Sequence, residues 1–247
     1  MGRLYRLFGT FLAGVKGGTR QSGTIVPAQL SPGNPHNMDA LAKDRTLIGV
    51  SELDLNPVAK PSRDEAMEAV RTLIAWAGDD PRREGLIDTP KRVVDAFGEW
   101  FEGYGADPSA ELSRIFEDVQ GYDDIVVLRD IEVESHCEHH MAPFLGKAYV
   151  AYMPTNKVVG ISKLARVVEI FCKRLQTQET LTQQIADAIT DSLKPAGVAV
   201  LIDAEHQCMT TRGVHHRHVS TITTQFTGVF KADRALQERF LSFCNRK

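Results

Sequence analysis

The sequence predicts an α+β fold with a mainly antiparallel sheet, and the order of its periodic segments supports this. From residue 62 to about residue 116, apolar side chains recur at helical spacing behind recognisable helix-start signals. Residues 125–133 and 147–153 instead alternate with a period of two, as strands do. Two helical stretches, two more strands and a last helix follow. Helices and strands that are grouped in this way are typical of α+β proteins.

Composition restricts the class of protein. The chain has 247 residues, of which 43% are hydrophobic and 25% charged, which suits one globular domain with an extension. A net charge of -3 gives no basic field for nucleic acid, and no run approaches the ~20 apolar residues that cross a membrane. The four cysteines are too few and too scattered for a disulfide framework, so we expect a reducing, cytoplasmic location.

Residues 1–60 lack sustained periodicity, and we expect them to form a disordered extension ahead of a domain at residues 61–247. The short apolar run at residues 7–15 raises the alternative of a signal or transit peptide, but glycines interrupt it. Arg6 stands where a myristoylation signal needs Ser or Thr. The sequence leaves open whether Met38 is the true start.

The helices and strands after residue 60 have local signals at their ends. Ser62 and Glu65 predict a capping box, and Pro90 predicts the first turn of a second helix. We expect Ser162 to cap a later helix. The remaining elements are expected as a short helix at 110–116, a helix that ends before Pro195, strands at 198–202 and 219–230, and a helix at 232–243.

Residues 136–140 combine one thiol, one carboxylate and three imidazoles. Cys137 and His140 have the Cys-x-x-His spacing with which one turn can bind a metal ion, and Cys208 is a second thiol downstream. We predict that these three residues bind Zn²⁺ with water in the fourth position. His139 and His206 are then left for proton transfer.

A structural zinc site is the alternative to this catalytic one. The second cluster supplies a single cysteine, each cluster carries an imidazole beyond the ligand count, and both clusters lie at predicted strand ends. These features favour catalysis. The histidines at 215, 216 and 218 are expected in a polar loop or strand start, because adjacent side chains of an extended segment point to opposite faces. We assign His136 no catalytic role, and we expect Cys172 and Cys244 to be ordinary core or surface residues.

Candidate substrate contacts follow the second strand. Ser162, Lys163 and Arg166 open a helix, where unpaired N–H groups and the helix dipole favour an anion such as a polyphosphate. A solvated helix face explains the same residues equally well. Arg212 could reach the same anion. Glu179, next to Gln178, could accept hydrogen bonds from guanine, although a glutamate in a first helical turn is common.

Five segments together resemble the GTP cyclohydrolase I family. They are residues 85–93 (GLIDTPKRV), 135–140 (SHCEHH), 160–166 (GISKLAR), 176–182 (QTQETLT) and 208–214 (CMTTRGV). The resemblance covers about residues 62–247 and excludes residues 1–60. Two positions depart from the family pattern, since histidines follow Val214 where a basic residue is frequent and Gln225 replaces a usual serine.

The resemblance implies the tunnelling fold, in which an antiparallel sheet carries two helices on one face, and a homodecamer with active sites between subunits. It implies conversion of GTP and water to 7,8-dihydroneopterin triphosphate and formate, the first step of pterin and folate synthesis. By motif, the residues carried over are Cys137, His140 and Cys208 for zinc, His139 and His206 for acid–base catalysis, Ser162, Lys163, Arg166 and Arg212 for triphosphate, and Gln178 and Glu179 for guanine.

Two other functions fit parts of the sequence. A zinc nucleoside deaminase requires Pro-Cys-x-x-Cys after its His-x-Glu, and the chain has no Cys-x-x-Cys. An inactive family member that acts as a zinc-containing nucleotide-binding module remains as the alternative, and the two are separated by release of formate from GTP.

Overall fold

The computed structural model describes residues 59–113, 115–116 and 122–245 of the 247. The predicted extension at residues 1–60 therefore lies almost wholly outside the described residues. So do the alternative start at Met38 and the apolar run at residues 7–15. Within the described ranges, no helix is both long enough and apolar enough to cross a bilayer.

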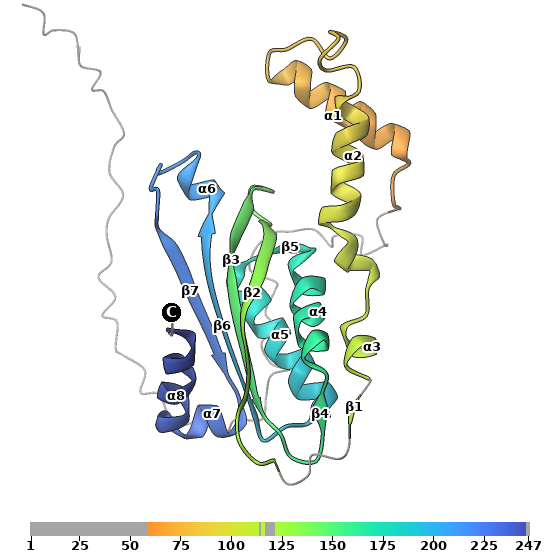
Figure 1. Cartoon of the computed structure of the whole chain (residues 1–247). Helices are drawn as coiled ribbons and strands as arrows, with labels where there is room; N and C mark the ends of the chain where they lie inside the picture. Colours follow the sequence, from red (N-terminus) through yellow and green to blue (C-terminus); the bar gives the residue numbers. More distant parts are fainter. Residues whose placement is uncertain (1–58, 114, 117–121, 246–247) are drawn as a thin grey trace, which may run out of the picture. The chain divides into compact units, whose positions relative to one another are not determined.

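Five strands form the central sheet in the order β5-β2-β3-β6-β7 (Figure 1). The strands are β2 (Val126–Cys137), β3 (Pro143–Met153), β5 (Leu175–Gln176), β6 (Gly197–His206) and β7 (Ser220–Phe226). All neighbours are antiparallel except the short β5, which runs parallel to β2. The prediction of a mixed α and β protein with a mainly antiparallel sheet is confirmed.

The helices that precede the sheet begin where the sequence predicts. In α1 (Arg63–Trp76), Ser62 and Glu65 form the complete capping box, and α2 (Thr89–Trp100) has Pro90 in its first turn. A 3₁₀ turn, η2 (Glu102–Gly105), and a short α3 (Pro108–Leu112) follow. The predicted helix at 110–116 was too long, because the chain instead forms β1 (Ile115–Phe116), which pairs with β4 (Val158–Val159).

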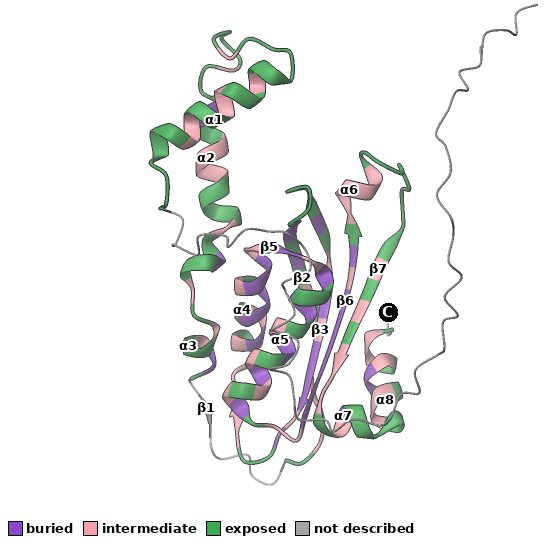
Figure 2. Cartoon of the chain, turned by 180° about the vertical axis from the view of Figure 1, so that it is seen from behind, coloured by how far each residue is buried: buried purple, intermediate pink, exposed green. Residues whose placement is uncertain are grey.

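Side chains of the sheet supply two cores on opposite faces. On one face, α4 (Ile161–Cys172) and α5 (Gln178–Leu193) cover Val198, Val200 and Ile202 of β6 together with buried residues of β2 and β3. On the other face, α7 (Gly228–Ala232) and α8 (Arg234–Cys244) cover the alternate β6 residues Ala199 and Leu201. Figure 2 shows the buried residues concentrated in the central strands and the inner sides of these helices.

The threonine-rich strand is shorter than predicted. It ends at Phe226 rather than near residue 230, because Gly228 turns the chain into α7 with a positive φ of 50°. A Cβ at Gly228 would collide with the backbone of Ala196 and Gly197, so glycine is required for this close approach.

Strand register brings distant residues to one end of the sheet. His136 lies opposite Pro143, and Phe144 lies opposite His206, so the end of β2 and the end of β6 flank the start of β3. The short α6 (Gln207–Thr210) continues directly from β6. Figure 1 shows α6 and the turn between β2 and β3 at the same end of the sheet.

We predict that Gly146→Ala destabilises the protein by about 1–3 kcal/mol, because the added methyl group would overlap the backbone of Asp203 and Ala204 in the neighbouring strand. Gly98→Ala is the matched control. An added Cβ at Gly98 in α2 meets no atom within 4 Å, and alanine favours a helix by about 1 kcal/mol. Urea unfolding of both variants tests this. Equal stability of G146A and the unsubstituted chain would contradict the tight β3–β6 contact.

Candidate active site

A tight turn at the end of β2 presents Cys137 and the histidines after it. The amides of His140 and Met141 both donate to the Cys137 carbonyl oxygen, at 3.3 and 2.7 Å, and the Cys137 amide donates to Ala142. Met141 takes a positive φ of 52° in this turn. The Cys137 sulfur consequently lies 3.8 Å from His139 Nδ1 and 3.9 Å from His140 Nδ1.

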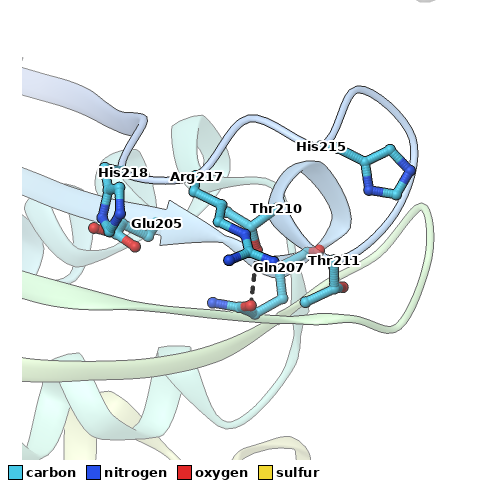
Figure 3. A pocket seen from close by; sticks show the side chains of 7 residues that line it. All are labelled: Glu205, Gln207, Thr210, Thr211, His215, Arg217 and His218. Atoms are coloured by element: carbon cyan, nitrogen blue, oxygen red, sulfur yellow. Dashed lines mark hydrogen bonds between the residues drawn. The ribbon is translucent and has the colours of Figure 1, made fainter.

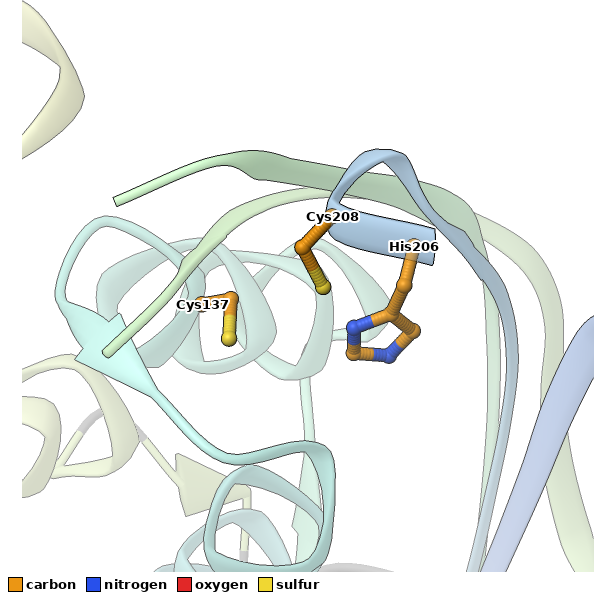
Figure 4. A group of neighbouring side chains, drawn as sticks. All are labelled: Cys137, His206 and Cys208. Atoms are coloured by element: carbon orange, nitrogen blue, oxygen red, sulfur yellow. The ribbon is translucent and has the colours of Figure 1, made fainter. Parts of the chain in front are cut away.

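The second half of the site comes from the end of β6. The ring of His206 stacks on Phe144, with 4.6 Å between ring centroids and 10° between planes. Cys208 follows in α6. Figure 4 shows one ring nitrogen of His206 facing the sulfurs of Cys137 and Cys208, and the three possible ligand atoms lie within 4.8 Å of one another. The structure therefore brings together the two cysteines that the sequence singled out.

The imidazole of this three-residue group is His206, whereas the sequence predicts His140 as the third ligand. His140 nevertheless borders the group, with Nδ1 near the Cys137 sulfur and Nε2 3.2 Å from a guanidinium nitrogen of Arg212. His139 is exposed, with Nε2 3.7 Å from a Glu138 carboxylate oxygen. Three imidazoles thus surround the two thiols.

Burial sets the charge states inside the group. Burial, and then the proximity of Cys137, raise the pKa of the Cys208 thiol above its ordinary value. Burial also lowers the pKa of His206, and the nearby Glu179 carboxylate partly opposes this effect. A neutral imidazole has a lone pair for a cation or a proton. Two adjacent thiols become thiolates most easily when a cation lies between them.

The start of α5 carries two predicted guanine contacts, Gln178 and Glu179, which differ in their exposure. Gln178 is 1% exposed, and its side chain bonds to His206 and to neighbouring strands. Glu179 is exposed and lines a pocket of about 220 Å³ with Thr182 and Thr223. In this structure Glu179 is open to a ligand, and Gln178 is enclosed.

The α4 cations lie at the other end of the sheet. Gly160, rather than the expected Ser162, occupies the N-cap position, and its carbonyl oxygen accepts from the Lys163 amide at 2.8 Å. Ser162 is exposed inside the first turn. The twelve residues of α4 span roughly 18 Å, from β4 to a C-terminus beside β5. Lys163 therefore lies far from Cys137 and Cys208 of the same chain.

Lys163 already forms an ion pair with a carboxylate of its own chain. Its Nζ lies 2.6 Å from Glu111 Oε2 of α3, with the two side chains 21% and 28% exposed. Arg166 is exposed and lines a pocket of about 420 Å³ with Glu111 and Lys173. Arg212 is the one predicted triphosphate contact that lies next to the Cys137 turn.

The histidine-rich loop between α6 and β7 lines a separate pocket of about 480 Å³. Figure 3 shows His218 beside Glu205, Arg217 beside Thr210 and His215 on the far side of the loop. His215 and His218 both have positive φ, at 55° and 62°. Among the described residues, these histidines do not join a cluster that could hold a metal. This agrees with the prediction of a polar loop.

Sequence reasoning missed several partners of the site. Phe144 stacks on His206, and Glu111 pairs with Lys163. The ring centroids of Trp100 and His136 lie 4.9 Å apart. Only Phe144 had a local signal, because it opens the strand after the Cys137 turn. The other two contacts join segments whose packing no sequence spacing reports.

The fold and the site define a class of protein: an α+β enzyme whose paired thiols and surrounding imidazoles suit metal-assisted hydrolysis. The family profile of GTP cyclohydrolase I matches residues 66–245. The chain belongs to the GTP cyclohydrolase I family, and its activity is that of a GTP cyclohydrolase.

Curated relatives agree with this assignment, and each is named GTP cyclohydrolase 1. The protein of Hyphomonas neptunium is 76% identical over 189 residues, which cover 76% of this chain and 92% of that one. The Maricaulis maris protein is 65% identical over 209 residues, or 85% of this chain and all of the relative. The Allorhizobium ampelinum protein is 56% identical over 189 residues, or 76% and 94%.

A solved structure of the archaeosine synthase QueF-Like in the apo form was also matched, at 16% identity over 43% of this chain and 96% of that one. Its TM-score of 0.35 is too low to define a shared fold.

Proposed function

We propose that the chain converts GTP and water to 7,8-dihydroneopterin triphosphate and formate with Zn²⁺ at the Cys137–Cys208 pair, as a first step toward pterins and folates. The observation that supports this most is the convergence of these two thiols with an imidazole from separate segments. Two sulfur donors and one imidazole are a ligand set that zinc prefers. Bound there, zinc would supply Lewis-acid activation of water for attack at the purine C8.

Two histidines compete for the role of third ligand. We propose His140, which leaves His206 for proton transfer, although it is the His206 ring nitrogen that groups with both sulfurs within 4.8 Å in this structure. If both imidazoles bound the ion, four protein ligands would close the site, and such sites are structural. A catalytic site requires that only one of them binds.

The two candidates make opposite predictions for zinc content. We expect His140→Ala to lose most bound zinc, because one of three ligands is removed, and His206→Ala to keep the metal but lose turnover. Zinc per subunit is measured by atomic emission after dialysis, with circular dichroism to check folding. Loss of zinc in H206A with retention in H140A would exchange the two roles.

Proton transfer is the role we propose for His139 and His206. Cleavage of the C8–N9 bond, release of formate and opening of the ribose ring each need a proton donor or acceptor. His206 suits this work because burial keeps it neutral, and His139 because it is exposed beside Glu138. We also propose that the exposed Glu179 accepts hydrogen bonds from guanine and that Arg212 binds phosphate, which its position beside His140 supports.

The remaining phosphate contacts point to an oligomer. Ser162 and Lys163 lie in the first turn of α4, almost one helix length from the end near the thiols, and Arg166 lies near its middle, so we propose that a neighbouring subunit supplies them. Strand β7 forms one edge of the sheet, and an edge strand is a natural place for pairing with another chain. A homodecamer with the tunnelling fold and interfacial sites, as in the family, explains both features.

The cytoplasm is the location we propose. All four cysteines are unpaired in the structure, and the paired thiols at the site must stay reduced to bind zinc.

The Glu111–Lys163 pair leads to a kinetic prediction. We expect Glu111→Gln to lower KM for GTP about threefold to tenfold, because it removes a carboxylate that competes with the triphosphate for Lys163, a repulsion of about 1 kcal/mol. Glu238→Gln is the control, since it removes the same charge from α8 on the other face of the sheet. Steady-state kinetics of both variants measure KM for GTP. An increased KM in E111Q would show that Glu111 instead orients Lys163.

The function itself is tested with the full-length protein and GTP. We expect equimolar formate and a pterin that becomes fluorescent after oxidation, with both lost after chelation and restored by zinc. Turnover that survives complete removal of zinc would reject the metal. Bound GTP without formate would favour the alternative of a zinc-containing nucleotide-binding module.

A further inference from the structure

We propose that Gln178 is a positioning residue that fixes His206 in the tautomer with its proton on Nε2. This rests on the proposed role of His206 in proton transfer. It assigns Gln178 a role that differs from direct contact with guanine, which the motif suggested.

The side chain of Gln178 is enclosed between α5 and the sheet. It is 1% exposed, and its Nε2 donates to the carbonyl oxygens of Ile202 and Thr221, at 3.1 and 2.7 Å. Nε2 also lies 3.2 Å from Thr223 Oγ1. At the other end of the amide, Oε1 lies 2.9 Å from His206 Nε2.

These contacts determine which way the amide group faces. Backbone carbonyl oxygens only accept hydrogen bonds, so the end that faces Ile202 and Thr221 must be the NH₂ group. The carbonyl end of Gln178 must then face His206. An amide oxygen only accepts, so the proton in this contact belongs to His206 Nε2. The orientation follows from the strand carbonyls and needs no assumption about the histidine.

The tautomer has a direct chemical consequence. With the proton of neutral His206 on Nε2, the lone pair is on Nδ1, the ring nitrogen that faces the sulfurs of Cys137 and Cys208 in Figure 4. Phe144 stacks on the ring and holds its plane. Gln178 and Phe144 together therefore determine which ring nitrogen of His206 carries the proton and which one faces the two sulfurs.

A role in direct substrate contact would need this network to break. Both N–H groups of Gln178 and its oxygen already have protein partners, and a buried carbonyl left without a donor costs about 1–3 kcal/mol. The exposed neighbour Glu179 needs no such rearrangement.

The test uses Gln178→Met in the full-length, zinc-loaded protein, because methionine keeps the volume and removes both ends of the amide. Solid-state NMR of ¹⁵N-histidine-labelled protein reports which ring nitrogen is protonated, with His206→Asn to assign the signal. We expect protonated Nε2 in the unsubstituted protein and a mixture of tautomers in Q178M. We also expect kcat to fall by about 10²-fold while KM for GTP stays within about twofold.

Gln176→Met is the matched control. Gln176 is also a buried glutamine, 3% exposed, but its amide bonds to the Phe171 carbonyl and to Gln184 rather than to a histidine. We expect Q176M to lose similar stability, measured by thermal unfolding, while it keeps the His206 tautomer and kcat.

Three results would overturn the proposal. They are a proton on Nδ1 in the unsubstituted protein, an unchanged tautomer in Q178M, or an increased KM with unchanged kcat, which would mark Gln178 as a substrate contact. If Q178M does not fold, the spectrum of the unsubstituted protein still decides. The tautomer is read without turnover, so failure of this proposal is distinguishable from failure of the proposed reaction.

Discussion

The register of the antiparallel strands β2, β3 and β6 is the constraint on which the site depends. Because β3 pairs with both neighbours, its first residues lie between the end of β2 and the end of β6. A slip of one residue would turn His206 to the opposite face of the sheet, away from Cys137. The two cores, on opposite faces of the same strands, prevent such a slip, since it would exchange Val200 and Ile202 with Ala199 and Leu201 and so disrupt the packing of both cores.

The site also contains an electrostatic conflict that its proposed ligand resolves. Two thiols close together each make ionisation of the other harder, and burial raises the pKa of Cys208 further. A divalent cation reverses both effects, because thiolate is then the favoured form. Gln178 and Phe144 hold the nearby imidazole through a hydrogen bond and a ring stack that involve only protein groups. This part of the site is therefore preorganised by the protein fold, as effective catalytic groups require.

Helix α4 packs on the core along one side and, under the proposed function, contacts the substrate with its first turns. Its buried side chains Leu164, Val167 and Val168 pack on the sheet, and its first turns carry the exposed or partly exposed Ser162, Lys163 and Arg166. Its direction along the sheet places Lys163 almost one helix length, and Arg166 about half of that length, from the end that lies near the thiols. Under the proposed function, one substrate bound by both sets requires two copies of the chain, which would couple activity to assembly.

The sequence alone determined the local features of this protein. The capping box at Ser62, the strands that lead to Cys137 and His206, the candidate ligands and the family all follow from residue types at short spacing. Tertiary structure decided that His206 groups with the sulfurs of Cys137 and Cys208, that Gln178 is enclosed, and that Glu111 pairs with Lys163. These contacts join segments dozens of residues apart, and their geometry depends on strand register and helix packing, which local spacing does not specify.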